Sequence, residues 1–271
     1  MKITIVTVSF NEEKNIARTI ESVLSQDSFD YEYIICDGKS SDKTVDIAES
    51  YTDKFRAKGI NYIVNSEKDL GIYDGMNKGI DLADGEYIYF LNAGDWLYSS
   101  YVISRIVSCA KEQSIPDVIY GDIATVERGF VGFSTGDDSK LLSHMSICHQ
   151  AVFVLTQHMK ARKYDLNYKV MADYNLLLSL KMENKSFFHI NETIAYFLVG
   201  GVSNTNGKQY YSDLINIRTS HGLPITFKNK IKYKIGPYRT SVVNKAKILM
   251  PKKIWYWWNI KIKKKILIND N

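Results

Sequence analysis

Short apolar segments alternate with helical patterns over the first ninety residues, and this alternation restricts the possible folds more than any other feature of the sequence. The segments expected to be strands are rich in Ile, Val and Tyr, and they span residues 2–9, 31–37, 60–65 and 86–91. The segments with apolar side chains at helical spacing span residues 12–25, 42–53 and 72–83. Strands that alternate with helices form crossover units, so we expect an α/β fold with a mostly parallel central sheet and flanking helices. Asn11 and Ser41 are the expected N-caps of the first two helices.

The pattern is less regular from residue 98 onward. Further helices are expected at 98–113 and 172–183, and further strands at 117–120, 186–190 and 193–199. We expect one domain to extend to about residue 207, with residues 208–271 forming a helical basic extension.

Charge is distributed unevenly along the chain. Residues 1–200 contain 20 Lys+Arg and 28 Asp+Glu, whereas residues 201–271 contain 15 and 2. A basic tail on an acidic body usually meets a polyanion, such as a membrane surface, a nucleic acid or an acidic partner.

Several protein classes are disfavoured by the sequence. No stretch approaches the roughly 18–20 apolar residues of a spanning helix. The apolar residues 3–10 lack the flanks of a cleaved signal, so secretion is disfavoured. The three cysteines are odd in number and widely spaced, which argues against a disulfide framework or a zinc site and fits a reducing cytoplasm.

Polar residues follow each expected strand of the first half. The sequence reads Val-Ser-Phe-Asn-Glu at 8–12, Asp-Gly-Lys-Ser-Ser-Asp-Lys-Thr at 37–44 and Asn-Ala-Gly-Asp at 92–95. A glycine-bearing segment at 66–79 precedes the last of these. Because open α/β sheets bind ligands at the carboxyl ends of their strands, these segments predict a binding site at one edge of the sheet.

Taken in this order, the segments resemble the family-2 glycosyltransferases, which are inverting enzymes with the Rossmann-like GT-A fold. The resemblance is close over residues 2–96 and looser over 148–203, and it is strongest to bacterial enzymes that build capsule, exopolysaccharide or O-antigen chains. It implies a nucleotide-sugar-binding half at 1–97 and an acceptor half at 98–207. It also implies transfer of a sugar from a nucleotide-diphosphate sugar, with UDP favoured, to a glycan or lipid-linked saccharide.

The resemblance assigns roles to individual residues. Asp173, at an expected helix start, is the implied general base. The implied donor-nucleotide residues are Val8, Ser9, Phe10, Glu12, Asp37, Asp74, Asn77 and Asn92. The implied acceptor or phosphate side comprises His149, Gln150, Gly201 and Ser203.

The same resemblance makes Asp95 the candidate ligand of a Mg²⁺ or Mn²⁺ ion. Such ions prefer one or two carboxylates together with phosphate oxygens. This chain has Asn92 and Gly94 where the family often has Asp, which leaves one carboxylate in the turn.

Structural interpretations remain open beside these roles. Asp37 is also suited to a turn that caps the next helix, Asp173 to an N-cap, and His149 to an ordinary hydrogen-bonded position. The segment at 92–95 is also suited to a turn without an ion.

The basic tail combines lysines with the run Trp-Tyr-Trp-Trp at 255–258. Trp and Tyr favour the membrane–water boundary, and Lys is drawn to anionic lipid. We therefore expect a cytoplasmic protein that is peripheral on the inner face of the membrane. A helix docked on the domain, or a nucleic-acid patch, would have the same composition.

Two other functions compete with glycosyl transfer. A sugar-phosphate nucleotidyltransferase would need a glycine-rich phosphate loop after the first strand, where this chain has Ser-Phe-Asn-Glu-Glu. A nucleic-acid-binding protein would use the tail but would leave the acidic strand ends unexplained. The base, the sugar, the acceptor, the linkage and the oligomeric state are left open.

Overall fold

The computed structural model describes residues 1–199 and 207–226, and from there to residue 267 only individual positions, among them 233, 254, 255, 259, 266 and 267. The predicted sites Gly201 and Ser203 lie outside the described residues, as does most of the basic tail.

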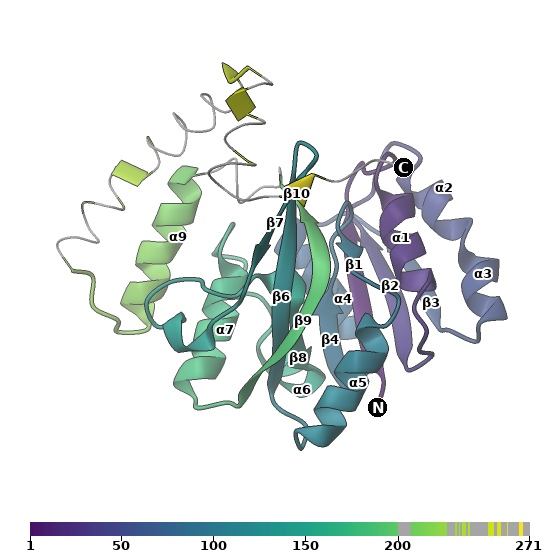
Figure 1. The fold of residues 1–271 in the computed structure, drawn as a ribbon, viewed down its shortest axis with the longest axis horizontal. Helices are drawn as coiled ribbons and strands as arrows, with labels where there is room; N and C mark the ends of the chain where they lie inside the picture. Colours follow the sequence, from purple (N-terminus) through teal and green to yellow (C-terminus); the bar gives the residue numbers. More distant parts are fainter. Residues whose placement is uncertain are drawn as a thin grey trace.

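The first half of the chain forms a parallel sheet with the order β3-β2-β1-β4 (Figure 1). Its strands are β1 (Ile3–Ser9), β2 (Tyr31–Asp37), β3 (Tyr62–Ser66) and β4 (Tyr87–Phe90). The connecting helices are α1 (Ile16–Leu24), α2 (Thr44–Glu49), α3 (Thr52–Ala57) and α4 (Ile72–Leu82). The predicted helix at 42–53 is therefore two short helices.

The second half adds mainly antiparallel strands, so the whole sheet is mixed. Strands β8 (Val152–Leu155) and β6 (Val118–Glu127) continue the sheet beyond β4, and β7 (Phe130–Ser134) returns beside β6. Arg128 (φ 51°) and Gly129 (φ 79°) form the turn of the β6–β7 hairpin. Two positive φ values in a two-residue turn match the twist of a hairpin, which explains why the chain reverses here.

A long strand, β9 (Phe187–Leu198), lies parallel to β6, with an irregular register around Asp122. Two separate strands were predicted in this region. The short β5 (Trp96–Leu97) pairs with β9, and Ile266–Leu267 (β10) pairs with β7.

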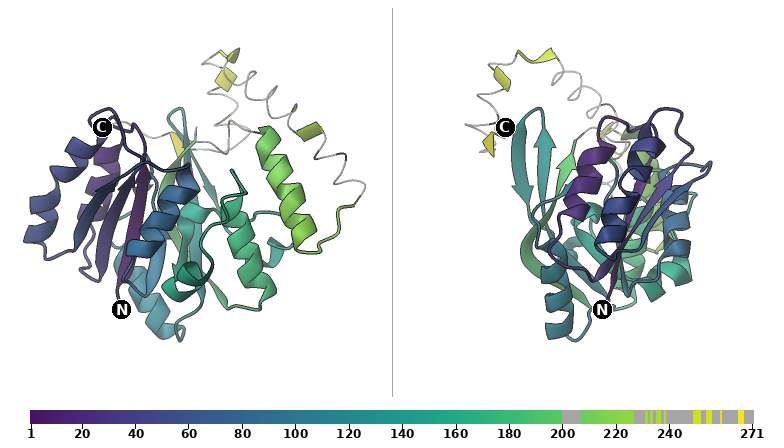
Figure 2. Two further views of the ribbon diagram at one scale, coloured as in Figure 1. Left: turned by 180° about the vertical axis from the view of Figure 1, so that it is seen from behind. Right: turned by 90° about the vertical axis from the view of Figure 1, so that its right-hand side faces the viewer.

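Helices cover both faces of the sheet, as predicted. One apolar core joins the sheet to α1, α2, α3 and α5 (Val102–Glu112). The other joins it to α4, α6 (Thr156–Arg162), α7 (Ala172–Met182) and α9 (Gly207–Ser220), and the view from behind shows α4 and α7 on that face (Figure 2). Within β1, Ile3 and Ile5 enter the first core whereas Val6 and Val8 enter the second, the alternation expected of a strand buried on both faces.

Neither predicted N-cap has that role. Asn11 has a φ of 54° and lies outside α1, which begins at Ile16 after Asn15. Its side-chain oxygen accepts the Ser41 N–H at 2.9 Å, so it ties two strand-end loops together. Asp42 instead accepts the Thr44 N–H at the start of α2.

At the amino end of the sheet, a buried carboxylate joins three strands. Glu32 accepts hydrogen bonds from the Lys2 ammonium at 2.7 Å, the Thr4 hydroxyl at 2.6 Å and the Asp84 N–H at 2.7 Å. Burial alone would raise the pKa of Glu32, but these bonds, with one from Asn61, lower it to about 2.

Helix α9 is part of the folded domain, because Leu214 and Ile217 enter the second core. Asp213 is 1% exposed, and its Oδ2 accepts the Val170 N–H at 2.8 Å and the Met171 N–H at 3.3 Å. The packed domain therefore continues beyond residue 207, where the basic extension was expected to begin.

Candidate active site

The predicted meeting of strand-end residues at one edge is present. Ser9 ends β1 and pairs in register with Asp37, which ends β2. The Ala93 N–H donates to the Val8 carbonyl at 3.1 Å, which holds the turn after β4 against the same end of β1. Asp37 and Asp95 therefore lie on one edge of the sheet.

Asp37 binds its neighbouring loops. It is 3% exposed and accepts the hydroxyls of Ser9 at 3.1 Å, Ser40 at 2.5 Å and Ser66 at 2.8 Å, together with the Ser40 N–H. These four bonds occupy the acceptor positions of a carboxylate. A nucleotide would therefore have to replace one of the hydroxyl donors to reach it.

The loop after β1 combines a fixed backbone with an exposed ring. Phe10 is 61% exposed, as a platform for a planar base requires. The Glu12 N–H donates to the Thr44 hydroxyl at 2.7 Å, and the Glu12 carboxylate accepts from Asn15 at 2.8 Å. This loop and the loop after β2 therefore form one wall.

Helix α4 presents its start to the same edge. Gly71 has a φ of 124°, and Asp74 accepts the Leu70 N–H at 2.9 Å. Gly75 lets α4 lie close on β1, because a Cβ there would stand 2.7 Å from Val8 Cγ1. Asn77 was expected to hold ligand hydroxyls, but its amide is 8% exposed and is bonded to the backbone N–H and carbonyl of Tyr164.

Asp173 lies at the start of α7 and contacts the N–H of the next residue and two side chains from other parts of the chain. Its Oδ1 accepts the Tyr174 N–H at 2.8 Å and the Tyr73 hydroxyl at 3.1 Å. His149 Nδ1 lies 3.1 Å from its Oδ2. The N-cap of α7 is Met171, so Asp173 is not the cap residue itself.

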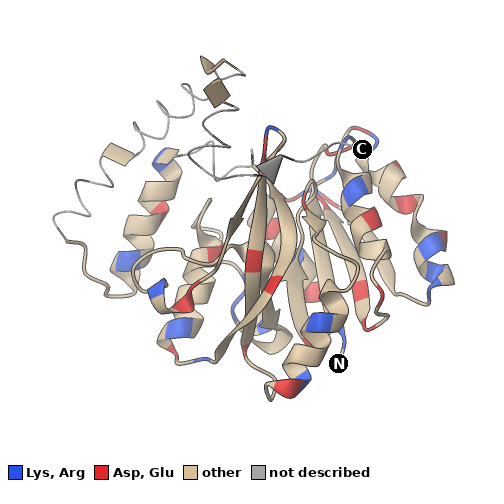
Figure 3. Cartoon of the chain, in the orientation of Figure 1, with Lys and Arg blue, Asp and Glu red and all other residues tan. Residues whose placement is uncertain are grey.

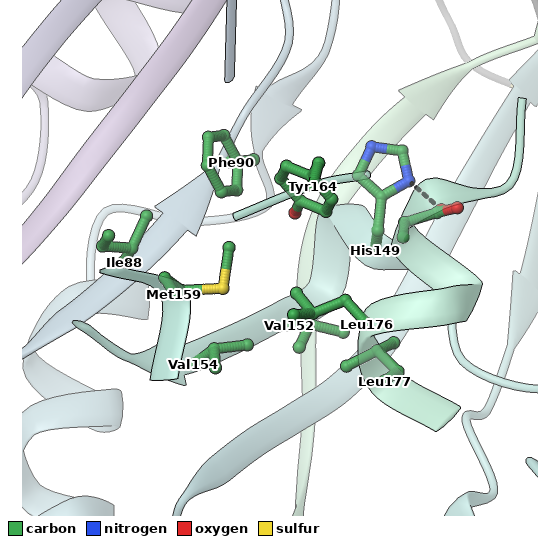
Figure 4. A pocket seen from close by; sticks show the side chains of 10 residues that line it. Ile88, Phe90, His149, Val152, Val154, Met159, Tyr164, Leu176 and Leu177 are labelled. Carbon is green, nitrogen blue, oxygen red and sulfur yellow. Dashed lines mark ion pairs between the residues drawn. The ribbon is translucent and has the colours of Figure 1, made fainter. Parts of the chain in front are cut away.

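His149 connects this carboxylate to the turn after β4. Its Nε2 lies 3.3 Å from Asn92 Nδ2, and its side chain is 22% exposed. His149 and Asp173 line a small cavity of about 10 Å³. Figure 4 shows His149 at one side of this cavity, above the apolar side chains of Leu176 and Leu177. That cavity has room for about one water molecule, so the His149 and Asp173 side chains lie against closely packed apolar residues.

Asp95 faces inward. It is 4% exposed, Oδ1 accepts the Leu198 N–H at 2.9 Å, and Oδ2 lies 3.4 Å from Gln150 Nε2. Burial raises the pKa of Asp95 to about 7, against the opposing effects of these bonds and of His149 and Arg18. In this structure Asp95 holds the end of β9 beside the site.

The turn at 92–95 does not fit a resident divalent ion. Both oxygens of its single carboxylate have partners in the protein. Asn92 Oδ1 is a buried oxygen with no hydrogen-bond partner among the residues that the structure describes. Within the ranges that the structure describes, no three His, Cys, Asp or Glu side chains gather as a metal-binding group.

Three residues near the site were not singled out in the sequence. Arg18 donates to the Gly94 carbonyl at 3.0 Å and stacks on Trp96, and burial lowers its pKa. The Tyr73 hydroxyl donates a hydrogen bond to Asp173, and Asp213 accepts one from the backbone N–H of Val170, in the segment before Asp173. Of these, only Tyr73 lies in one of the strand-end segments singled out in the sequence, at 66–79, and its ring gave no sign of a partner 100 residues away.

Comparison with known proteins agrees with this geometry. The family model described as "Glycosyl transferase family 2" matches residues 4–167. A "PGL/p-HBAD biosynthesis glycosyltransferase" of Mycobacterium bovis is 30% identical over 207 residues, which cover 74% of this chain and 79% of that protein.

Solved structures share the fold. The Staphylococcus aureus TarS fragment 1–349 in complex with UDP-GlcNAc aligns with a TM-score of 0.67 and 15% identity, covering 95% of this chain and 78% of that one. A mannosyltransferase of Pyrobaculum calidifontis in complex with GDP-Man and Mn²⁺ aligns with a TM-score of 0.63 and 11% identity, covering 97% and 80%.

These matches decide against the nucleotidyltransferase and nucleic-acid-binding alternatives. The family model over residues 4–167 and the relative at 30% identity lead to one assignment: the chain is a glycosyltransferase of family 2 with the GT-A fold.

Proposed function

We propose that this protein transfers a sugar from a nucleotide-diphosphate donor, with UDP favoured, to a hydroxyl of a glycan or lipid-linked saccharide, with inversion, in bacterial surface polysaccharide biosynthesis. The observation that carries the proposal is the placement of Asp173 between His149 and Tyr73, on the sheet edge that also holds Asp37 and Asn92. The UDP-GlcNAc and GDP-Man named for the structural neighbours support a nucleotide-sugar donor.

Asp173 is the proposed general base because one of its oxygens retains acceptor capacity. Oδ1 already accepts two hydrogen bonds, whereas among the described residues Oδ2 has a single contact, to His149. The acceptor hydroxyl gives its proton to Oδ2 as its oxygen bonds to the anomeric carbon. On the opposite side of that carbon, the bond to the phosphate oxygen breaks and the nucleoside diphosphate leaves.

In the proposed enzyme, the nucleotide binds to the donor half of the domain, residues 1–97. Phe10 stacks with the base, while Asp37 and Glu12 accept hydrogen bonds from base or ribose, with Val8 and Ser9 forming the floor. Asp74 and Asn92 face the sugar side, and Asn77 positions the wall through Tyr164. His149 and Gln150 border the acceptor side, and Gly201 and Ser203 are proposed to close over the diphosphate.

We propose that Mg²⁺ or Mn²⁺ binds only together with the donor, because the turn at 92–95 lacks a free carboxylate. The neighbour with GDP-Man and Mn²⁺ supports an ion in the donor complex. In an EPR titration, free Mn²⁺ should keep its signal with the protein alone and lose it when the matching nucleotide is added. Loss of the signal with the protein alone would show a resident site.

No helix within the described ranges is long and apolar enough to span a bilayer. We propose that the basic tail after α9, residues 228–271, attaches the cytoplasmic enzyme to the inner face of the membrane through its basic and aromatic side chains.

A panel of UDP-, GDP- and dTDP-sugars tests the proposed function. A donor should raise the midpoint of unfolding, because ligands stabilise the state that binds them, and should be converted slowly to the nucleoside diphosphate. If no nucleotide sugar stabilises the protein or is turned over, the proposal is wrong.

A further inference from the structure

A second cavity, of about 290 Å³, lies beside the candidate active site. Strands β6 and β7 form one side through Ile123, Ser134 and Thr135, and the segment Met145–Cys148 forms the other. Its volume corresponds to roughly ten water molecules in the liquid, which is more than an ion or a phosphate needs.

Sheet register places the Ser134 side of the cavity on the face of the sheet that carries the first core. Ser134 pairs with Ile123, and Ile123 pairs with Ala195 of β9. Side chains in one row of a sheet share a face, and Ile123 and Ala195 both belong to the first core. Phe133 is the next residue along β7, so its side chain points to the other face, where it is 52% exposed.

Chain connectivity links the cavity to the proposed base. Cys148 lines the cavity and directly precedes His149, which contacts Asp173. The Cys148 thiol donates to Gln150 Oε1 at 2.8 Å, and Gln150 also faces Asp95. The wall of the cavity and the wall of the active site are therefore one short segment.

The lining is polar but uncharged. Ser134, Thr135 and Ser146 bring hydroxyls, Ile123, Met145 and Ile147 bring apolar surface, and no Lys, Arg, Asp or Glu among the described residues lines the cavity. Acidic positions do occur on β6 and β9 (Figure 3). On β6, however, Asp122 is paired with His189 at 2.9 Å and accepts the Thr135 hydroxyl at 3.2 Å.

We propose that this cavity binds an uncharged sugar ring of the acceptor. The inference rests on the proposed function and adds the chemical class of the acceptor. Hydroxyl side chains pair with sugar hydroxyls, while the apolar residues cover the C–H face of the ring. A uronic acid or a sugar phosphate would bring an anion into a lining without a cation to pair with it, and burial of an unpaired charge is unfavourable.

The test measures nucleoside diphosphate release from the donor identified above, with and without methyl glycosides. The panel contains neutral methyl hexopyranosides, including gluco, galacto, manno and N-acetylglucosamine forms, and the matching methyl hexuronides. At least one neutral glycoside should stimulate release tenfold or more, and no hexuronide should do so.

Ser134→Trp places a large side chain in the cavity, and Phe133→Trp is the matched control on the opposite face of the same strand. Stimulation should be lost in Ser134→Trp and kept in Phe133→Trp. The donor should still raise the midpoint of unfolding of both variants, which shows that they are folded. If Ser134→Trp does not fold, Met145→Glu provides a second variant, in which an anion in the lining should abolish the response to neutral glycosides.

Three results would overturn the inference: stimulation by hexuronides alone, stimulation by no glycoside, or full stimulation in the folded Ser134→Trp variant. In each of these three cases the wild-type protein would still bind the donor. Failure of the proposed function is different, because then no nucleotide sugar binds.

Discussion

The carboxylates of Asp37, Asp95 and Asp173 lie at the candidate active site but differ in how many of their hydrogen-bond acceptor positions are already occupied. Asp37 accepts four hydrogen bonds and Asp95 is enclosed by Leu198 and Gln150, whereas Asp173 keeps capacity on Oδ2. Asp173→Asn should therefore lower transfer by at least about a hundredfold, the scale of general-base catalysis, while the donor dissociation constant stays near normal. Single-turnover kinetics and donor titration measure the two quantities.

Asp53→Asn is the control, because Asp53 is an exposed carboxylate paired only with Arg56 on the surface. It should transfer sugar at the wild-type rate. Near-normal turnover in Asp173→Asn would remove that residue from the mechanism.

At the level of residues, the sequence indicated which side chains gather at the edge but not which way they point. Asp37, Asn92 and Asp173 were placed correctly at strand or helix ends. The inward turn of Asp95 and the bonds of Asn77 to Tyr164 depend on partners 55 or more residues away. Local pattern carries no information on such contacts.

Helix α9 acts on the site through one buried carboxylate. Asp213 accepts hydrogen bonds from the backbone N–H groups of Val170 and Met171, three and two residues before Asp173. Asp213→Ala leaves these donors unpaired, at a cost of about 1–3 kcal/mol each, and frees the segment that positions the base. We expect a lower midpoint of unfolding and a tenfold or greater loss of kcat, with little change in donor affinity.

Gln209→Ala separates the two effects, because it removes the 2.7 Å bond from Gln209 to the other oxygen of Asp213 and leaves the Asp213 carboxylate itself in place. It should change kcat much less than Asp213→Ala does. Equal kcat values in Asp213→Ala and the wild type would show that α9 has no role in positioning Asp173.

The buried Glu32 carboxylate at the amino end of the sheet should make the stability of the fold depend on pH. The pKa of Glu32 is lowered to about 2 in the folded protein from its ordinary value of 4.5. Its stabilisation is therefore complete above about pH 4.5 and is lost as the pH falls toward 2. Glu32→Gln should unfold more easily than the wild type by about 2–3 kcal/mol at pH 7, since hydrogen bonds to a charged group are strong.

Chemical denaturation at several pH values measures this difference, which should shrink below pH 4.5. Glu112→Gln, at an exposed position of α5, should match the wild type throughout. A difference between Glu32→Gln and the wild type that stays constant with pH would contradict the assignment.

At the level of elements, the parallel half could be predicted because each strand and helix has a clear period. The antiparallel half depends on a two-residue hairpin turn at Arg128-Gly129 and on irregular register near Asp122. The chain before Leu155, where the sequence pattern is irregular, is mostly loop, with a 3-10 turn (η2, His149–Ala151) and the short strand β8. Such features follow from tertiary pairing rather than from local periodicity.

The whole molecule combines an acidic catalytic body with a basic tail. Deleting residues 228–271 should move the protein from the membrane fraction to the soluble one. Because Trp255 lies over Arg128 and Tyr233 packs near Tyr211, a milder variant is also needed. Replacing Lys261, Lys263, Lys264 and Lys265 with Gln should weaken co-sedimentation with anionic vesicles by removing about 1 kcal/mol of attraction for each lysine.

Neutral phosphatidylcholine vesicles are the control, and neither protein should bind them strongly. Unchanged binding of the quadruple variant to anionic vesicles would show that these lysines do not attach the enzyme.

A crystal structure with the stabilising nucleotide sugar tests the central claim most directly. We expect the base against Phe10 and Asp37, the diphosphate beside the Asn92 turn, and the anomeric carbon with one side open toward Asp173 Oδ2. A donor bound away from this edge of the sheet, or one whose anomeric carbon has its phosphate side toward Asp173, would contradict the account.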